Sequence, residues 1–117
     1  MKPLHHALIS VKKHGGVVED YMPIHNWFDK SKSGFADVRH RAARHHSEGI
    51  YWCEEHFGDI LVNSDGKKIS VRTIAEQHVI DDLGWIPSLK DWLQNLQLEP
   101  WMRKANKRAL KEISLED

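Results

Sequence analysis

Apolar residues recur at α-helical spacing along most of the 117-residue chain, and glycine or proline ends each run. The longest run extends over residues 35–57 and includes Val38, Ala42, Ile50 and Cys53. A chain of this length is typical of one domain with its own core. The pattern therefore predicts a mainly α-helical, single-domain bundle with the 35–57 helix at its centre.

One short segment has the pattern of strands. Residues 59–62 and 67–71 flank an Asn-Ser-Asp-Gly turn, which predicts a single β-hairpin. Residues 103–111 hold five basic residues and no acidic one. We therefore expect a His-rich helical domain over residues 1–98 and a basic C-terminal helical extension over 99–117. The other predicted helices cover residues 3–13, 19–29 and 73–83, with a further one opening at Ser88.

Composition excludes several classes of protein. The chain has 17 Lys and Arg against 17 Asp and Glu, which argues against an extended nucleic-acid surface or a membrane partner. No apolar stretch approaches the length of a membrane span. The single Cys53 cannot form an intramolecular disulfide, so we expect a cytoplasmic protein.

Nine histidines are the unusual feature of the composition. Three predicted helices each place imidazole near an apolar face, and His78 and Asp82 are four residues apart on one of them. Three imidazoles and a carboxylate suit Zn²⁺ or, with softer selectivity, Mn²⁺, Fe²⁺ or Ni²⁺. The first helix offers His5 or His6 and the long helix offers His45 or His46. The predicted metal ligands are His6, His46, His78 and Asp82.

The long helix is also dense in arginine. Arg41, His45 and Glu48 would share one of its faces. The guanidinium group of arginine can donate two parallel hydrogen bonds to a phosphate, and imidazole can transfer protons. This surface therefore suits a phosphorylated ligand. A solvated helix face with ordinary charge pairs explains the same residues. The predicted catalytic residues are His40 and His45, and the predicted substrate-binding residues are Arg39, Arg41, Asn63 and Arg72.

A structural interpretation stands beside the metal site. The histidines can form a buried hydrogen-bond network without any ligand. Asn63 is sufficiently explained as a turn residue. His14, His25 and His56 do not belong to a cluster of other candidate site residues in the sequence, and we predict that they are incidental surface or helix-end residues. Exposed tryptophans are typical of interfaces, and Trp85 and Trp101 are the candidates here.

The motif order resembles that of an uncharacterised family of small phage and bacterial proteins. The resemblance covers about residues 3–96 and implies no established reaction. It implies a phage or mobile-element context, in which nucleotide signals are a ligand class to consider. The strings that carry it are HHALISVKKHGG, IHNWFDKSK, DVRHRAARHHSEGI, NSDG and IAEQHVIDDLGWIPSLKDWL.

These observations predict a metal-dependent phosphohydrolase or phosphodiesterase that acts on a small nucleotide, as a phage counter-defence protein in the host cytoplasm. One alternative is a module that sequesters a nucleotide or another anion without turnover. The other is a protein-interaction module, such as a homo-oligomer, whose histidines form a structural network.

Overall fold

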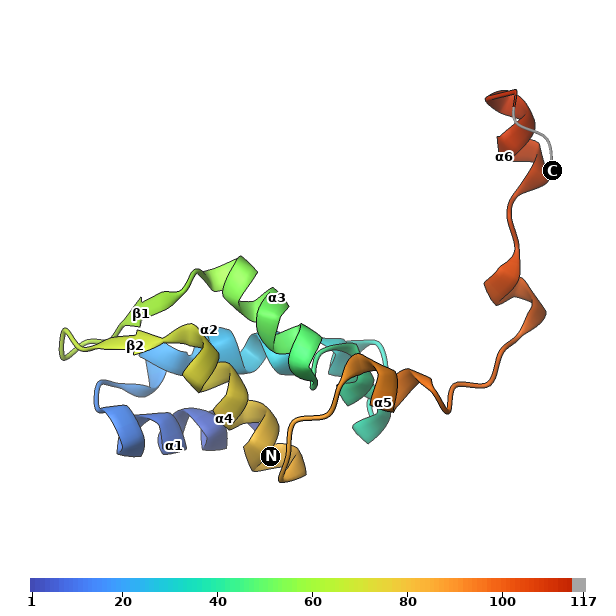
Figure 1. Cartoon of the computed structure of the whole chain (residues 1–117). Helices are drawn as coiled ribbons and strands as arrows, with labels where there is room; N and C mark the ends of the chain where they lie inside the picture. The colour runs from blue at the N-terminus through green and yellow to red at the C-terminus, as the bar shows by residue number, and fades with distance from the viewer. Residues whose placement is uncertain (115–117) are drawn as a thin grey trace.

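The computed structural model describes residues 1–114. This part of the chain is mainly α-helical with a single two-stranded hairpin, which confirms the predicted fold class (Figure 1). The α-helices are α1 (Pro3–His14), α2 (Val18–Asp29), α3 (Ser47–Phe57), α4 (Val71–Leu83), α5 (Leu89–Leu93) and α6 (Lys107–Glu112); the 3-10 helices are η1 (Lys30–Ser33), η2 (Val38–Ala43) and η3 (Pro100–Arg103); the strands are β1 (Ile60–Val62) and β2 (Lys68–Ser70).

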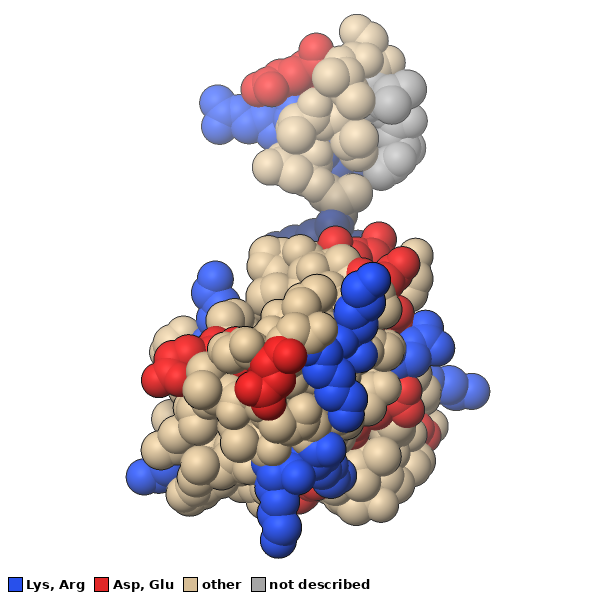
Figure 2. Space-filling view, turned by 90° about the vertical axis from the view of Figure 1, so that its left-hand side faces the viewer, with Lys and Arg blue, Asp and Glu red and all other residues tan. Residues whose placement is uncertain are grey.

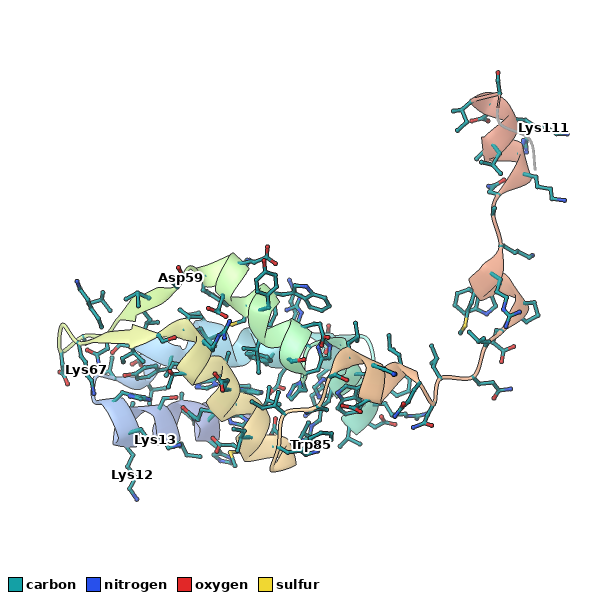
Figure 3. The ribbon with its side chains drawn as sticks, in the orientation of Figure 1. Lys12, Lys13, Asp59, Lys67, Trp85 and Lys111 are labelled. Carbon is teal, nitrogen blue, oxygen red and sulfur yellow. The ribbon has the colours of Figure 1, made fainter. Side chains whose placement is uncertain are left out.

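Helix α1 has favourable residues at both ends. Pro3 occupies the first turn, where its missing N–H costs no hydrogen bond. Lys12 and Lys13 lie in the last turn, where positive charge offsets the helix dipole. Both are exposed, and Lys12 points away from the body (Figure 3). Gly15 then turns the chain with a φ of 80°.

The core lies between α1, α2, α3 and α4. Helix α1 packs along α2, and α4 packs against both α2 and α3. The side chains of Phe28, Cys53, Ile74 and Val79 are completely buried there. Burial of this apolar surface is what holds the four helices together.

The hairpin forms where the sequence predicts it. Leu61 pairs with Ile69 in an antiparallel register. The Asn63 side-chain oxygen accepts hydrogen bonds from the backbone N–H groups of Asp65 and Lys67, and this fixes the turn.

The predicted continuous helix over residues 35–57 is wrong. The chain forms the short η2, breaks at residues 44–46 and starts again as α3. His46 is the N-cap of α3, and its Nδ1 accepts a hydrogen bond from the N–H of Gly49 at 2.9 Å. A capping side chain satisfies a backbone donor that the start of a helix leaves free, so the break is locally stable.

Gly49 has a close neighbour that explains the missing side chain. A Cβ atom at this position would overlap the backbone carbonyl of Arg44, which folds back over the first turn of α3. Because the helix breaks here, Arg41, His45 and Glu48 do not share a helical face, contrary to the expectation from spacing.

After α5 the chain leaves the helical body, and η3 and α6 extend away from it (Figure 1). Leu98 and Trp101 on this extension are more than half exposed, as is Trp85 on the body. On the face of the body in Figure 2, basic and acidic side chains lie side by side. Within residues 1–114, no helix combines the length and the apolar character needed to span a membrane.

Candidate metal centre

Four side chains from three parts of the fold converge at one buried point. We call Asp29, His45, His78 and Asp82 the Asp–His cluster; each offers one ligand atom, and these atoms lie within 4.8 Å of one another. Asp29 ends α2, His45 lies in the break before α3, and His78 and Asp82 are one turn apart on α4. The cluster therefore exists only when α2, α4 and the break are packed together.

The spacing of these atoms suits a single divalent cation. His45 Nε2 lies 3.0 Å from Asp82 Oδ2 and 3.4 Å from Asp29 Oδ1, and His78 Nε2 lies 3.4 Å from each of these oxygens. Ligands about 2.0–2.2 Å from a tetrahedral ion are about 1.6 times that distance from one another, or roughly 3.3–3.6 Å apart. The cluster could thus hold a metal ion with little movement.

Both imidazoles of the Asp–His cluster have a buried nitrogen with no hydrogen-bond partner. His78 Nε2 is buried and aimed at the two carboxylates, but neither contact has hydrogen-bond geometry. His45 Nδ1 is also buried without a partner. Buried polar atoms are nearly always satisfied in native proteins, so the environment of His78 Nε2 favours a bound cation.

The carboxylates of the cluster are held in the charged form. Burial alone would raise the pKa of Asp29, but the His45 and His78 rings outweigh it and bring the pKa well below its usual range. The pKa of Asp82 is lowered in the same way, chiefly by His45 and His6. Burial likewise opposes protonation of His45, yet the two carboxylates raise its pKa above the ordinary value. The two carboxylates are thus charged oxygen ligands, and a cation that binds between them would displace the proton from His45.

Two other imidazoles are kept neutral. Burial lowers the pKa of His78 to about 4, although Asp29 opposes the shift. Burial and the neighbouring His78 lower the pKa of His25 to about 3. Neutral imidazole is the form that binds metals.

Asp82 is held by more than the cluster. Its Oδ1 lies 3.1 Å from His6 Nε2, 3.7 Å from an Arg41 guanidinium nitrogen and 3.0 Å from the Met1 amino group. The His6 ring also stacks on His78 with 3.7 Å between ring centroids. The predicted ligand His6 therefore lies beside the cluster and orients Asp82, while Oδ2 of Asp82 faces the centre.

The predicted ligand His46 lies outside the cluster, and its neighbour His45 lies inside. The Nδ1 of His46 caps α3 and its Nε2 lies 3.1 Å from the carbonyl oxygen of Ala43, so both ring nitrogens are engaged. The structure thus brings together His6, His45, His78 and Asp82 from the predicted residues.

Two important residues were missed by the sequence reasoning. His25, expected on the surface, is completely buried, with its Nδ1 2.9 Å from His78 Nδ1. Asp29 was interpreted only as a helix end. A signal was available, because His25 and Asp29 repeat on α2 the four-residue spacing of His78 and Asp82 on α4. His14 and His56 do lie near helix ends, as expected.

The other predicted substrate-binding residues do not reach the cluster. Asn63 is a turn residue whose amide donates to the His14 carbonyl and the Tyr21 hydroxyl. Arg72 pairs with Glu54 at 2.8 Å. Arg39 is exposed and pairs with its neighbour Asp37.

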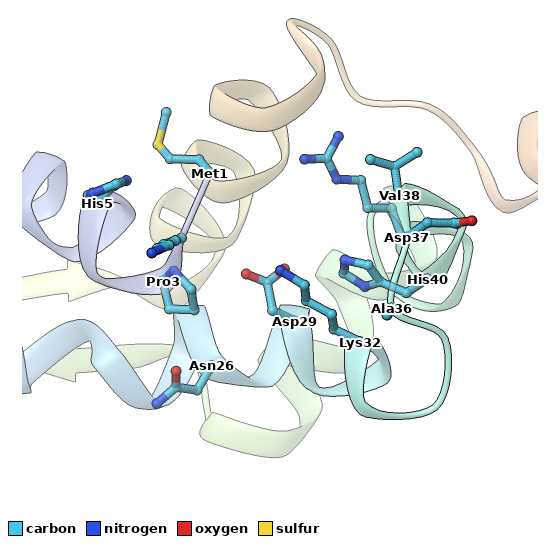
Figure 4. Close-up of a pocket in the computed structure, with 12 residues that line it drawn as sticks. Met1, Pro3, His5, Asn26, Asp29, Lys32, Ala36, Asp37, Val38 and His40 are labelled. Carbon is cyan, nitrogen blue, oxygen red and sulfur yellow. The ribbon is translucent and has the colours of Figure 1, made fainter.

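A cavity of about 480 Å³ opens beside the cluster, within the usual range for small-molecule sites. Asp29 lines it and is the most exposed member of the cluster, at 13%. Lys32 and His40 face the same space as Asp29 (Figure 4). His40 Nδ1 lies 3.1 Å from the Ser31 hydroxyl, which orients the ring. The basic residues that line the cavity are Lys2, His5, Lys32, His40 and Arg41.

The fold and the cluster define a small, mainly α-helical protein with a candidate metal centre between its helices. The chain belongs to the family described as Domain of unknown function (DUF6915), whose family model matches residues 1–102. This confirms the resemblance to an uncharacterised family and extends it past residue 96. No curated protein and no solved structure matches the chain.

Proposed function

We propose that the protein is a metal-dependent phosphohydrolase that acts on small phosphorylated molecules. The observation that carries this proposal is the position of the cavity. It opens onto Asp29 of the Asp–His cluster and is otherwise rich in basic side chains. A site that combines a cation with positively charged walls suits an anionic ester rather than a neutral substrate.

The ligand atoms of the Asp–His cluster narrow the choice of metal ion. Imidazole nitrogen is a borderline ligand and carboxylate oxygen is a hard one. A set of two of each suits Zn²⁺ and also Mn²⁺, which binds carboxylates well. Cys53 is buried elsewhere in the core and offers no thiolate to the cluster. We therefore expect Zn²⁺ or Mn²⁺ to be the working ion.

Arg41 and Lys32 are the residues we assign to the phosphate. Both line the cavity, and a guanidinium nitrogen of Arg41 lies 3.7 Å from Asp82. Arg41 thus sits between cavity and cluster, where it would bind a phosphate oxygen and neutralise charge that develops during reaction.

The reaction would be attack of water on phosphorus. A divalent ion in the cluster supplies Lewis-acid chemistry and lowers the pKa of water. The bond from the water oxygen to phosphorus forms, the ester P–O bond breaks, one proton leaves the water, and the departing oxygen gains one. His40 lines the cavity with one nitrogen held by Ser31, so its other nitrogen is the group we assign to proton transfer.

The substrate class to test first is a nucleotide. The resemblance to small phage and bacterial proteins supports this choice, because nucleotide signals act in bacterial defence against phage. A role as a phage counter-defence protein in the host cytoplasm would follow from such an activity.

The test is hydrolysis by the full chain after loading with Zn²⁺ or Mn²⁺. Para-nitrophenyl phosphate and its bis-ester report monoester and diester cleavage, and chromatography of nucleotides after incubation reports the natural class. We expect turnover that chelation abolishes. Nucleotides recovered bound but unchanged would overturn the hydrolase and support the alternative of a sequestering module.

Two arginines provide a matched pair of variants. Arg41→Gln removes a cavity cation and is expected to raise KM at least tenfold. Arg39→Gln removes an exposed arginine that does not itself line the cavity, although its partner Asp37 does, and is expected to change KM far less. Equal effects of the two substitutions would contradict the assignment of Arg41 to the phosphate.

A further inference from the structure

We propose that Gln77, Ser10 and His25 form a hydrogen-bond chain that keeps a proton on Nδ1 of His78, so that its Nε2 is the nitrogen presented to a metal. This inference rests on the proposed function only in taking His78 as a ligand. Each member of the chain is buried, so solvent does not compete for its hydrogen bonds.

The orientation of the Gln77 amide starts the chain. Its Nε2 lies 3.0 Å from the carbonyl oxygen of His6 and 3.1 Å from a carboxylate oxygen of Asp81. Both of these oxygens accept hydrogen bonds, so the amide nitrogen must be the atom between them. The Gln77 side-chain oxygen therefore faces Ser10.

The Ser10 hydroxyl has one proton and three polar neighbours. The Gln77 oxygen lies 2.8 Å from it and the His6 carbonyl oxygen 3.1 Å, and both accept. The third neighbour is His25 Nε2, at 2.8 Å. Because the hydroxyl proton is used on an acceptor oxygen, His25 Nε2 must carry a hydrogen and donate it to Ser10.

The two histidines complete the chain. His25 Nδ1 lies 2.9 Å from His78 Nδ1, so one of these atoms donates and the other accepts. His25 is completely buried and already holds its one hydrogen on Nε2, so its Nδ1 is the acceptor of this pair. His78 Nδ1 is therefore the donor.

The consequence lies at the other side of the His78 ring. With the hydrogen on Nδ1, the Nε2 atom of His78 has a lone pair that can bind a metal ion. This nitrogen lies 3.4 Å from a carboxylate oxygen of Asp29 and 3.4 Å from one of Asp82. Metal-binding histidines commonly donate their second N–H to a neighbour, which fixes the tautomer and strengthens the ligand. His25, Ser10 and Gln77 are thus positioning residues that act through His78.

Nuclear magnetic resonance of the metal-free, full-length protein tests the tautomers directly. Long-range ¹H–¹⁵N correlation spectra of histidine-labelled protein report which ring nitrogen carries hydrogen. We expect a protonated Nδ1 on His78 and a protonated Nε2 with bare Nδ1 on His25. After Zn²⁺ is added, Nε2 of His78 should report coordination, whereas Nδ1 of His78 and both ring nitrogens of His25 should not. A bare Nδ1 on His78, or a protonated Nδ1 on His25, would overturn the proposal.

Metal titration of variants gives a second readout that uses no substrate. Ser10→Ala removes the acceptor for His25 and is expected to weaken Zn²⁺ binding by about 10- to 100-fold, the range for orienting residues around metal ligands. Ser33→Ala is the control, because the Ser33 hydroxyl only contacts the exposed Lys30 carbonyl. Unchanged Zn²⁺ affinity in Ser10→Ala would contradict the positioning role, whether or not the protein hydrolyses phosphate esters. Should Ser10→Ala not fold, the spectra of the unmodified protein still decide.

Discussion

The Nδ1 atoms of His25 and His78 face each other at 2.9 Å in the core between α2 and α4. Each of these helices carries an aspartate four residues after its histidine, Asp29 on α2 and Asp82 on α4. Both aspartates point to the same centre, but of the histidines on α2 and α4 only His78 joins them there. The two helices thus repeat one spacing and use it differently: α4 supplies two ligands, and α2 supplies one ligand and a support for His78.

The adjacent histidines 45 and 46 give the first prediction. His45→Gln removes a member of the Asp–His cluster and should lower the affinity for Zn²⁺ or Mn²⁺ at least 100-fold in a calorimetric titration. His46→Gln should keep full metal stoichiometry, because His46 only caps α3. It should instead lower the free energy of unfolding by about 1 kcal/mol, the usual cost of a lost cap. If His46→Gln lost metal binding while His45→Gln kept it, His46 and not His45 would be the ligand, which would contradict the proposed cluster.

Gly49 gives the second prediction. Gly49→Ala should destabilise the protein by more than about 2 kcal/mol in urea denaturation, because the added Cβ overlaps the Arg44 carbonyl and a buried turn cannot move freely. Gly34→Ala is the control, since the added atom there meets only ordinary contact at 3.6 Å and the backbone φ is negative. Similar stabilities for the two variants would show that the break does not depend on this close approach.

The buried neutral histidines predict how stability changes with pH in the metal-free protein. The pKa of His25 is lowered to about 3 and that of His78 to about 4, whereas an unfolded histidine has a pKa of about 6.5. Between these values the unfolded chain binds more protons, so their stabilisation is complete above pH 6.5 and is lost as the pH falls. The carboxylates Asp29 and Asp82, with lowered pKa values, add to the loss in stronger acid.

His45 opposes this trend. Its pKa is raised, so its contribution is present below pH 6.5 and is lost as the pH rises. The pKa is lowered not only for His25 and His78 but also for His14, His40 and His46, so we expect a net loss of stability between pH 7 and pH 5. Urea denaturation of the metal-free protein at the two pH values measures it, with the exposed His5→Gln variant expected to behave as the unmodified chain. Equal or greater stability at pH 5 would contradict the buried neutral state of His25 and His78.

The fold was largely predictable because its signals are local. Apolar spacing before Gly15 predicts α1, acidic residues in the first turn predict α2, and a capping box at Thr73 with Gly84 as the stop predicts α4. The Asn63 turn predicts the hairpin. The break at residues 44–46 was not predictable from spacing. It depends on a side-chain cap by His46 and on a close backbone approach at Gly49, and neither interrupts the apolar pattern.

The candidate site was predictable in part for the same reason. His78 and Asp82 lie one helical turn apart, so their shared face follows from the sequence. A continuous helix led us to expect His46 as the ligand. The break at residues 44–46 instead places His45 in the cluster and leaves His46 as the N-cap of α3. His25 and Asp29 were overlooked because only the packing of α2 against α4 shows that this face of α2 is interior.

Asp29, His45, His78 and Asp82 are the side chains that we propose hold one divalent ion. Anomalous scattering from crystals grown with Zn²⁺ tests it most directly, with data collected on both sides of the zinc absorption edge. We expect a single strong peak among the four side chains, about 2.0–2.2 Å from the Nε2 atoms of both histidines and from a carboxylate oxygen of each aspartate. Absence of a peak there, or a peak that involves His46 in place of His45, would contradict it.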